Sequence, residues 1–218
     1  DADGAVVAIR ALDKSSWQCA PAAGRLDVHY EVYAWDLSVR TAHLDTTHGF
    51  FNGTSVFLAV AGRSDAPCVV TIERPEGEIG RDWKLVTALP PEHGRPGQAC
   101  RFGRFRAADY DELIDHPVEL GEFERIRFKA CGVPHEFVVS GKHKADLKRL
   151  AADSKRICEW QIRFFGEPAP FERYVFMLYA SADGYGGLEH RNSTALICQR
   201  ADLPRLQPKN ASGAPEKP

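Results

Sequence analysis

The stretch Tyr174-Val175-Phe176-Met177-Leu178-Tyr179-Ala180 is an unbroken apolar run, of the kind found in β-strands that are covered on both faces. It follows the strongest helical signal of the chain, which extends over residues 145–165. Apolar and small residues recur there at intervals of three and four, at Leu147, Leu150, Ala151, Ser154, Ile157, Cys158, Gln161, Phe164 and Phe165. Gly166 and Pro168 then act as helix stop signals. The sequence therefore predicts a long helix followed by a buried strand.

Toward the N-terminus the sequence indicates β structure. Leu26, Val28, Tyr30, Val32 and Ala34 alternate with more polar residues, which is the period of a half-buried strand. Further short strands are expected at residues 54–60, 68–72, 83–87, 123–129 and 136–140, the last two joined by a turn at 131–134. Gly, Pro, Asn and Asp separate these runs, which favours an antiparallel sheet or sandwich. No helical period precedes residue 110.

The composition excludes several classes of protein. Of the 218 residues, 44% are hydrophobic and 27% charged, which is ordinary globular usage and excludes wholesale disorder. The 28 lysines and arginines are balanced by 30 acidic residues, so the formal charge is -2 and we expect no nucleic-acid partner. No run approaches the roughly 18 apolar residues of a membrane span, and we expect no membrane partner.

The cysteines and the two ends of the chain give weaker signals. No Cys-x-x-Cys pair occurs, so we expect buried free thiols at Cys19, Cys68, Cys100, Cys131, Cys158 and Cys198. The chain begins at Asp1 without a Met or a leader, which is compatible with a removed signal or an internal start, and with a cytoplasmic or a periplasmic protein. From Pro204 onward the composition favours a flexible tail.

Several familiar catalytic motifs fail on spacing. A dinucleotide-binding loop at Gly184 and Gly186 is excluded because Glu189 occupies the position of its third glycine. His135-Glu136 begins like the zinc-protease motif His-Glu-x-x-His, but Val139 stands where the second histidine must be. No Gly-x-Ser-x-Gly elbow and no P-loop are present.

Other polar residues are expected to have ordinary roles. His43 and His48 are near each other in sequence, and we expect them at the surface rather than at a metal. Asp111, Glu112 and Asp115 could be paired carboxylates, but a solvated linker at a domain boundary is the favoured interpretation.

Three tryptophans and one glycosylation motif complete this group. Trp17, Trp35 and Trp83 lie in strand-like settings, where core packing is favoured over a stacking platform. Asn52-Gly53-Thr54 matches an N-glycosylation motif, which matters only in a secretory host.

The segment from Tyr185 to Thr194 is the chemically richest in the chain. It combines two glycines with a carboxylate, an imidazole, a guanidinium, an amide and two hydroxyls. Gly186 and Gly187 let backbone approach another group closely, and Glu189 would supply a carboxylate beside an open strand edge. Such a site suits an ammonium group together with strand-like hydrogen bonds to a peptide. A hairpin tip with merely solvated charges is the alternative.

This segment resembles the Gly-Gly-Leu-Glu-His signature of the glycyl aminopeptidase family, metallopeptidase family 61. Further stretches resemble that family in the same order, namely residues 35–40, 49–54, 110–121, 131–135 and 174–176. The resemblance extends over nearly the whole chain up to about Leu203.

The resemblance implies an α+β fold in which a β-rich, saddle- or sandwich-like N-terminal domain precedes the first α/β part of a thermolysin-like catalytic domain. The first domain would span residues 1–117 and lack its opening strands, the second residues 118–203, and a flexible tail residues 204–218.

The resemblance also implies a site. Glu189 would hold the free α-amino group of a peptide substrate, and Gly186 and Gly187 would form the edge along which its backbone lies. The full set of expected substrate-binding residues is Gly186, Gly187, Leu188, Glu189, His190, Arg191 and Asn192.

The family's zinc site does not occur in this sequence. The family places a helical His-Glu-x-x-His and a further glutamate downstream of this segment, and neither is present before Pro218. We therefore expect a fragment of a zinc metallo-aminopeptidase that removes small N-terminal residues, Gly or Ala. Zinc would bind in the intact parent, whose remaining chain is a partner, while the fragment alone would hold no metal, contribute no catalytic residue and be inactive. The alternative is a non-enzymatic β-rich module that binds proteins or peptides.

Overall fold

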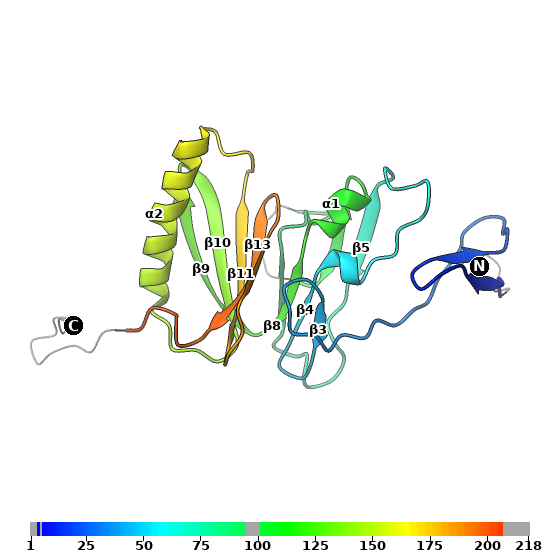
Figure 1. The fold of residues 1–218 in the computed structure, drawn as a ribbon, viewed down its shortest axis with the longest axis horizontal. Coiled ribbons are helices and arrows are strands. Elements are labelled where there is room, and N and C mark those ends of the chain that lie inside the picture. The colour runs from blue at the N-terminus through cyan, green and yellow to red at the C-terminus, as the bar shows by residue number, and fades with distance from the viewer. Residues whose placement is uncertain (1–3, 5, 95–100, 207–218) are drawn as a thin grey trace, which may run out of the picture. The chain divides into compact units, whose positions relative to one another are not determined.

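The computed structural model describes residues 4, 6–94 and 101–206, and the chain divides into two compact units, Asp1–Tyr33 and Ala34–Pro218 (Figure 1). In the first unit, β1 (Ile9–Ala11) pairs antiparallel with β2 (Trp17–Cys19). Trp17 is 51% exposed, so its predicted core packing is wrong: a two-stranded hairpin has no second layer to cover the indole.

The second unit begins with two small antiparallel sheets. One has the strand order β3 (Ala42–Leu44), β4 (His48–Phe51), β8 (Val118–Gly121), β6 (Lys84–Thr87), and the other pairs β5 (Cys68–Ile72) with β7 (Gly103–Ala107). A 3-10 turn, η1 (Gly53–Ser55), and a short helix, α1 (Tyr110–Ile114), lie between the strands in sequence. Trp83 and Leu85 are buried in the core of this part, as expected for Trp83. Strand β8 begins at Val118, just after the expected domain boundary. It nevertheless pairs with β4 and β6, and so is part of the four-stranded sheet formed with earlier residues. The domain boundary expected at residue 117 stays a prediction.

The rest of the unit is a mixed five-stranded sheet. Its strand order is β12 (Gly186–Glu189), β13 (Ser193–Gln199), β11 (Tyr174–Ser181), β10 (Val133–Ser140), β9 (Phe123–Ala130). The strands β10, β11 and β13 are parallel, and the two edge strands run antiparallel to them. A two-residue turn joins β9 to β10 through Cys131 and Gly132, which both have positive φ, as tight hairpins require.

Helix α2 (Leu147–Phe165) connects the parallel strands β10 and β11 and lies along the sheet beside β9 (Figure 1). The Asp146 side chain caps its first turn by accepting a hydrogen bond from the Arg149 backbone N–H at 3.1 Å. Gly166, with φ +106°, ends it. Leu147 and Leu150 pack on Leu178 and Ala180 of the sheet. The predicted helix and the buried strand that follows it are both confirmed.

The five-stranded sheet packs its other face against the four-stranded sheet. Val86 of β6 shares one buried cluster with Val138 and Met177, and Phe50 of β4 shares another with Ala195 and Ile197. The molecule is thus β-rich with few helices, which confirms the predicted α+β class. None of the helices in the described part of the chain is long and apolar enough to cross a membrane.

Some expected features are absent where the sequence predicted them. Residues 26–34 alternate as a strand does, yet they form no strand, and Leu26, Val28, Tyr30 and Val32 stay 38–48% exposed. In residues 54–60 only the end of the η1 turn is regular. Alternation describes the chain's own preference, whereas a strand also needs a neighbouring strand to pair with. Trp35 is 62% exposed, so its predicted burial is wrong too.

The predictions for the thiols and the tail are met in part. Five cysteines lie in the described residues and all are free and partly buried, while Cys100 lies outside them. The tail expected from Pro204 begins with ordered residues. Leu203 is buried, and the Pro204 carbonyl accepts a hydrogen bond from the Asp146 N–H at 2.6 Å. Residues 207–218 lie outside the described part.

Candidate functional site

The edge strand β12 carries the residues that the sequence singled out. Gly186–Glu189 pairs with β13 on one side, and β12 stands at the end of the strand order of the described sheet. One row of its backbone N–H and C=O groups is therefore open to an added strand. The structure thus places a free strand edge where a peptide backbone is expected to lie.

Gly187 and Glu189 point to the same face of the sheet as helix α2. Gly187 is opposite Leu196, and Leu196 is opposite Leu178, which packs under the helix. A Cβ on Gly187 would lie 3.3 Å from the Glu189 Oε1 atom, tighter than an ordinary contact. Glycine at this position therefore leaves room for the exposed Glu189 carboxylate along the strand.

The alternate residues of β12 face the other way and fix the strand. Leu188 packs against the cluster that contains Val39 and Phe50, and a Cβ on Gly186 would meet Val39 at 3.6 Å. Just before the strand, the Gly184 N–H donates a hydrogen bond to the Ser181 hydroxyl. A Cβ on Gly184 would lie 2.8 Å from that hydroxyl oxygen. The close approach of this turn to β11 therefore requires glycine at position 184.

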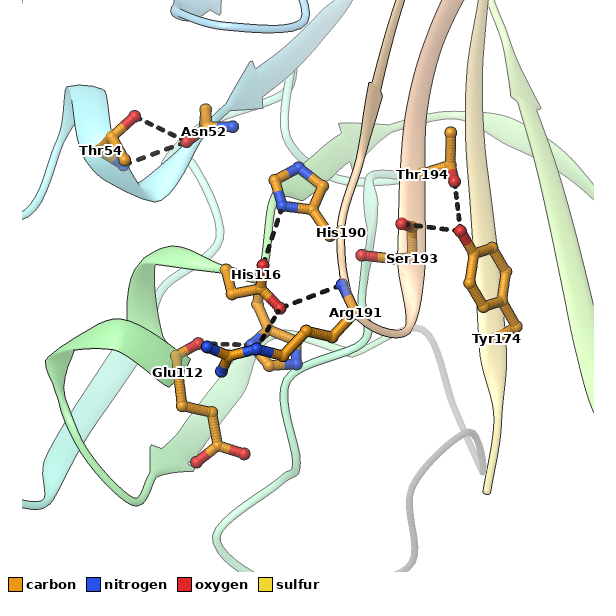
Figure 2. Close-up of polar contacts among 10 residues, drawn as sticks. Asn52, Thr54, Glu112, His116, Tyr174, His190, Arg191, Ser193 and Thr194 are labelled. Atoms are coloured by element: carbon orange, nitrogen blue, oxygen red, sulfur yellow. Dashed lines mark hydrogen bonds and ion pairs between the residues drawn. The ribbon is translucent and has the colours of Figure 1, made fainter. Parts of the chain in front are cut away.

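The hairpin end that follows Glu189 is held by Asp115. The His190 Nδ1 atom lies 3.4 Å from Asp115 Oδ1, and the Arg191 backbone N–H donates to Asp115 Oδ2 at 3.2 Å. The Arg191 guanidinium approaches the same carboxylate at 4.0 Å while remaining largely exposed. Figure 2 shows His190 and Arg191 beside the segment that carries Glu112, which is in α1, and His116, which follows α1. Two segments 76 positions apart in sequence thus meet at one carboxylate.

The environment of His190 disfavours its charged form. Burial lowers the pKa of His190, and the charge and hydrogen bonding of Asp115 oppose this change only in part. Within the described residues, His190 Nε2, Asn192 Oδ1 and Ser193 Oγ are buried without a hydrogen-bond partner. Three unsatisfied polar atoms in one hairpin tip are unusual.

Tyr174 anchors the same hairpin tip. Its hydroxyl donates to the Ser193 carbonyl at 3.0 Å and contacts the Thr194 hydroxyl (Figure 2). Neither Tyr174 nor Asp115 was singled out by sequence reasoning as part of the site. Asp115 was expected in a solvated linker, which is wrong: the linker is helix α1, and Asp115 follows it at the C-cap.

The histidines near β4 are also not where the sequence put them. His43 is 9% exposed and His48 3%, because their rings stack in a row between Trp35 and Tyr179. Burial, followed by the nearby His43, lowers the pKa of His48 to about 4, and Asp45 opposes this change. The predicted surface position is wrong because β3 and β4 pack against the five-stranded sheet.

The asparagine of the glycosylation motif is buried in the folded chain. Asn52 is 2% exposed, and its Oδ1 accepts hydrogen bonds from the Thr54 N–H at 3.2 Å and the Thr54 hydroxyl at 2.8 Å (Figure 2). The side chain caps the η1 turn and is not accessible in the folded chain.

Comparison with known proteins identifies the family. Residues 1–122, more than half of the chain, match the family model of the peptidase M61 N-terminal domain. The chain belongs to the peptidase M61 family. This confirms the resemblance that the motifs indicated.

Solved structures include one from a protein that is similar over nearly the whole chain. An aminopeptidase N family protein from Idiomarina loihiensis is 44% identical, with a TM-score of 0.89, over 95% of this chain and 34% of its own. The M61 chain therefore spans about a third of that protein's length. An M1 zinc metallopeptidase from Deinococcus radiodurans matches at 12% identity and a TM-score of 0.46 over 77% of this chain and 39% of its own, too little to argue from. No curated protein matches the chain in sequence.

The zinc ion of metallopeptidases does not fit the M61 residues described here. Within these residues one group could offer three ligands to a metal ion, His43, Asp45 and His48. Their candidate ligand atoms all lie within 4.8 Å of one another. However, Asp45 Oδ1 already accepts the N–H groups of Thr47 at 2.6 Å and His48 at 3.0 Å, and so closes the hairpin turn. The two imidazole rings stack 4.8 Å apart, and lone pairs lying in stacked ring planes do not converge on one ion. Among the described residues, this group is therefore a packed structural cluster and not a zinc site.

Proposed function

We propose that this M61 chain supplies substrate recognition to a metallo-aminopeptidase. The observation that carries the proposal is the exposed Glu189 carboxylate at the end of a free strand edge, with Gly187 beside it. A peptide would lie along Gly186–Glu189 through backbone hydrogen bonds, and its ammonium group would pair with Glu189. Leu188 and Asn192 would shape the edge, while His190 and Arg191 would hold it through Asp115.

The finer parts of the proposal come from the family. Membership of M61 supports removal of N-terminal Gly or Ala and the use of zinc in the intact parent as parts of this proposal. Zinc would supply an activated water for hydrolysis of the scissile bond. Since the 218 residues contain no His-Glu-x-x-His, we expect the chain alone to bind peptides with a free N-terminus without cleaving them. Hydrolysis of Gly or Ala anilides by the purified chain would contradict this.

The test of Glu189 uses the intact parent enzyme. Glu189→Gln removes the charge and keeps the shape, so kcat/KM on substrates with a free amino group should fall about 100-fold or more, as for loss of a charge-assisted contact. N-acetylated substrates, which lack the ammonium, should show no such difference. Glu122→Gln, at an exposed position off the edge strand, is the matched control. An unchanged kcat/KM for Glu189→Gln would refute the assigned role.

A further inference from the structure

The tip of the β12–β13 hairpin is held on its two sides by different parts of the chain. On the β13 side, strand β11 holds it, because the Tyr174 hydroxyl donates to the Ser193 carbonyl at 3.0 Å. On the β12 side, Asp115 holds His190, the residue that directly follows Glu189. The end of the strand that presents Glu189 is therefore fixed by a carboxylate from outside the sheet.

The Asp115 carboxylate uses both of its oxygens on this hairpin. Its Oδ1 atom lies 3.4 Å from the His190 Nδ1 atom, and its Oδ2 atom accepts the Arg191 backbone N–H at 3.2 Å. The His190 side chain is 7% exposed and the Asp115 side chain 20%, so solvent has little access to these contacts. Because a side chain and a backbone group of consecutive residues are held together, both the position and the direction of the strand end are fixed.

Asp115 itself lies on a well-anchored segment. It is the C-cap residue of α1, and its N–H donates to the Asp111 carbonyl at 3.1 Å. The next residue, His116, is 4% exposed, and its Nδ1 atom lies 2.6 Å from the Glu112 carbonyl oxygen. Strand β8 begins shortly afterwards, at Val118. The end of a helix and the start of a strand therefore carry the carboxylate, which makes its position precise.

The contact with Asp115 leaves the face that carries Glu189 open. Glu189 lies on the α2 face of the sheet, whereas His190, the next residue, meets Asp115, which precedes strand β8 of the four-stranded sheet. Asp115 thus holds the strand end without occupying the space around the Glu189 carboxylate. A charge-assisted hydrogen bond requires donor and acceptor to approach within about 2.7–2.9 Å, so a shift of the strand end by about 1 Å would weaken it greatly.

We propose that Asp115 is a positioning residue for the amino-terminal ammonium group of the substrate, and that it acts through His190 and Arg191 to hold Glu189 where that group binds. The inference rests on the proposed function of Glu189 and adds to it a residue from the segment between α1 and β8. Without the Asp115 carboxylate, β12 keeps its pairing with β13, but the end of the strand loses its second anchor.

The test is a double-mutant cycle in the intact parent enzyme, with a Gly anilide as the substrate. Asp115→Asn removes the charge and one acceptor oxygen, so kcat/KM should fall about 10-fold or more. In a Glu189→Gln background, where no carboxylate remains to be positioned, Asp115→Asn should change kcat/KM by less than about 2-fold. Asp111→Asn removes an exposed carboxylate of α1 and should leave kcat/KM unchanged in both backgrounds.

A second variant separates position from charge and from loss of the fold. Asp115→Glu keeps the carboxylate and moves it by one methylene group, so it should also lower kcat/KM, and only where Glu189 is present. Thermal unfolding of each variant shows that it is folded at the assay temperature.

Three outcomes would overturn the inference. If Glu189→Gln lowers kcat/KM and neither Asp115 variant does, the role of Glu189 stands and that of Asp115 is refuted. Equal losses in the two backgrounds would show that Asp115 supports the fold and does not position Glu189. If Glu189→Gln itself has no effect, the proposed function fails and this inference fails with it.

Discussion

At the scale of single residues, Glu119 places a carboxyl group between the two main sheets. It is 3% exposed and lines a small cavity together with His48 and Tyr179. Burial raises the pKa of Glu119 to about 8, and the Ser140 hydroxyl opposes the rise only in part. Between its usual pKa of 4.5 and about 8, the folded protein therefore holds a proton at Glu119 that the unfolded chain has lost.

The sign of the pH dependence follows from this proton. Because the folded state binds more protons, the contribution of Glu119 to stability is complete below pH 4.5 and is lost as the pH rises toward about 8. The free energy of unfolding should fall with pH by up to about 1.4 kcal/mol per unit relative to Glu119→Gln, which cannot ionise. Urea unfolding of both proteins at about pH 5 and about pH 8 measures the difference.

His48 provides the internal check on this prediction. Its pKa of about 4, below the usual 6.5, has the opposite effect: its contribution is present above 6.5 and is lost as the pH falls toward 4. That contribution is shared by the wild type and Glu119→Gln and cancels in their difference. Parallel stability curves for the two proteins would contradict a protonated Glu119.

What the sequence could predict about single residues depended on how local their roles are. Glu189 belongs to a motif of consecutive residues, so the sequence can point to it directly, and its role stays a prediction. Asp115 acts through His190 and Arg191, which are about 75 positions away, and no pattern around Asp115 signals that pairing. The burial of His43 and His48 likewise depends on Tyr179, from a different sheet.

At the scale of elements, the turn after β10 depends on the space around one glycine. Gly141 has φ +80°, and a Cβ there would lie 2.6 Å from the Ala180 carbonyl oxygen. Gly132, in the turn between β9 and β10, has nearly the same φ, +81°, with nothing within 4 Å of its would-be Cβ. The two positions share the backbone strain and differ only in the clash.

Alanine at each position should separate these two costs. Gly132→Ala should destabilise by about 1 kcal/mol, from the left-handed backbone alone. Gly141→Ala should cost about 2–4 kcal/mol, because overpacking against β11 is added. Denaturant unfolding of the two variants measures both values, and equal losses would show that the backbone near Ala180 moves freely.

Elements with a strong internal pattern were predictable, and those that depend on neighbours were not. The apolar run of β11 and the period of α2 each specify their own element, because a helix forms its hydrogen bonds within itself and β11 is covered on both faces. The alternation at residues 26–34 is as regular but finds no partner strand in the described chain. Ile157 and Phe164 of α2 follow the helical period too, so the sequence grouped them with the buried residues although they are 62% and 65% exposed.

At the scale of the whole second unit, an ion triad joins the two main sheets. Glu136 of β10 binds Arg125 of β9 at 2.8 Å and Arg173, just before β11, at 3.2 Å. Arg173 also donates to the carbonyl of Thr87 in β6, 86 positions away, at 3.3 Å. The Glu136 carboxylate is 5% exposed and the two guanidinium groups are 16% and 21% exposed, so solvent screens the triad only weakly.

Removing the negative charge should weaken the junction between the sheets as well as the triad itself. Glu136→Gln takes the shared carboxylate charge away from two largely buried guanidinium groups and should lower the free energy of unfolding by about 3–5 kcal/mol. Glu124→Gln, on the neighbouring β9 strand, removes the same charge from a side chain that is 64% exposed and should cost less than about 1 kcal/mol. Urea unfolding compares the two variants. If their losses are alike, the triad does not join the sheets, and the apolar clusters around Val86 and Phe50 hold them together alone.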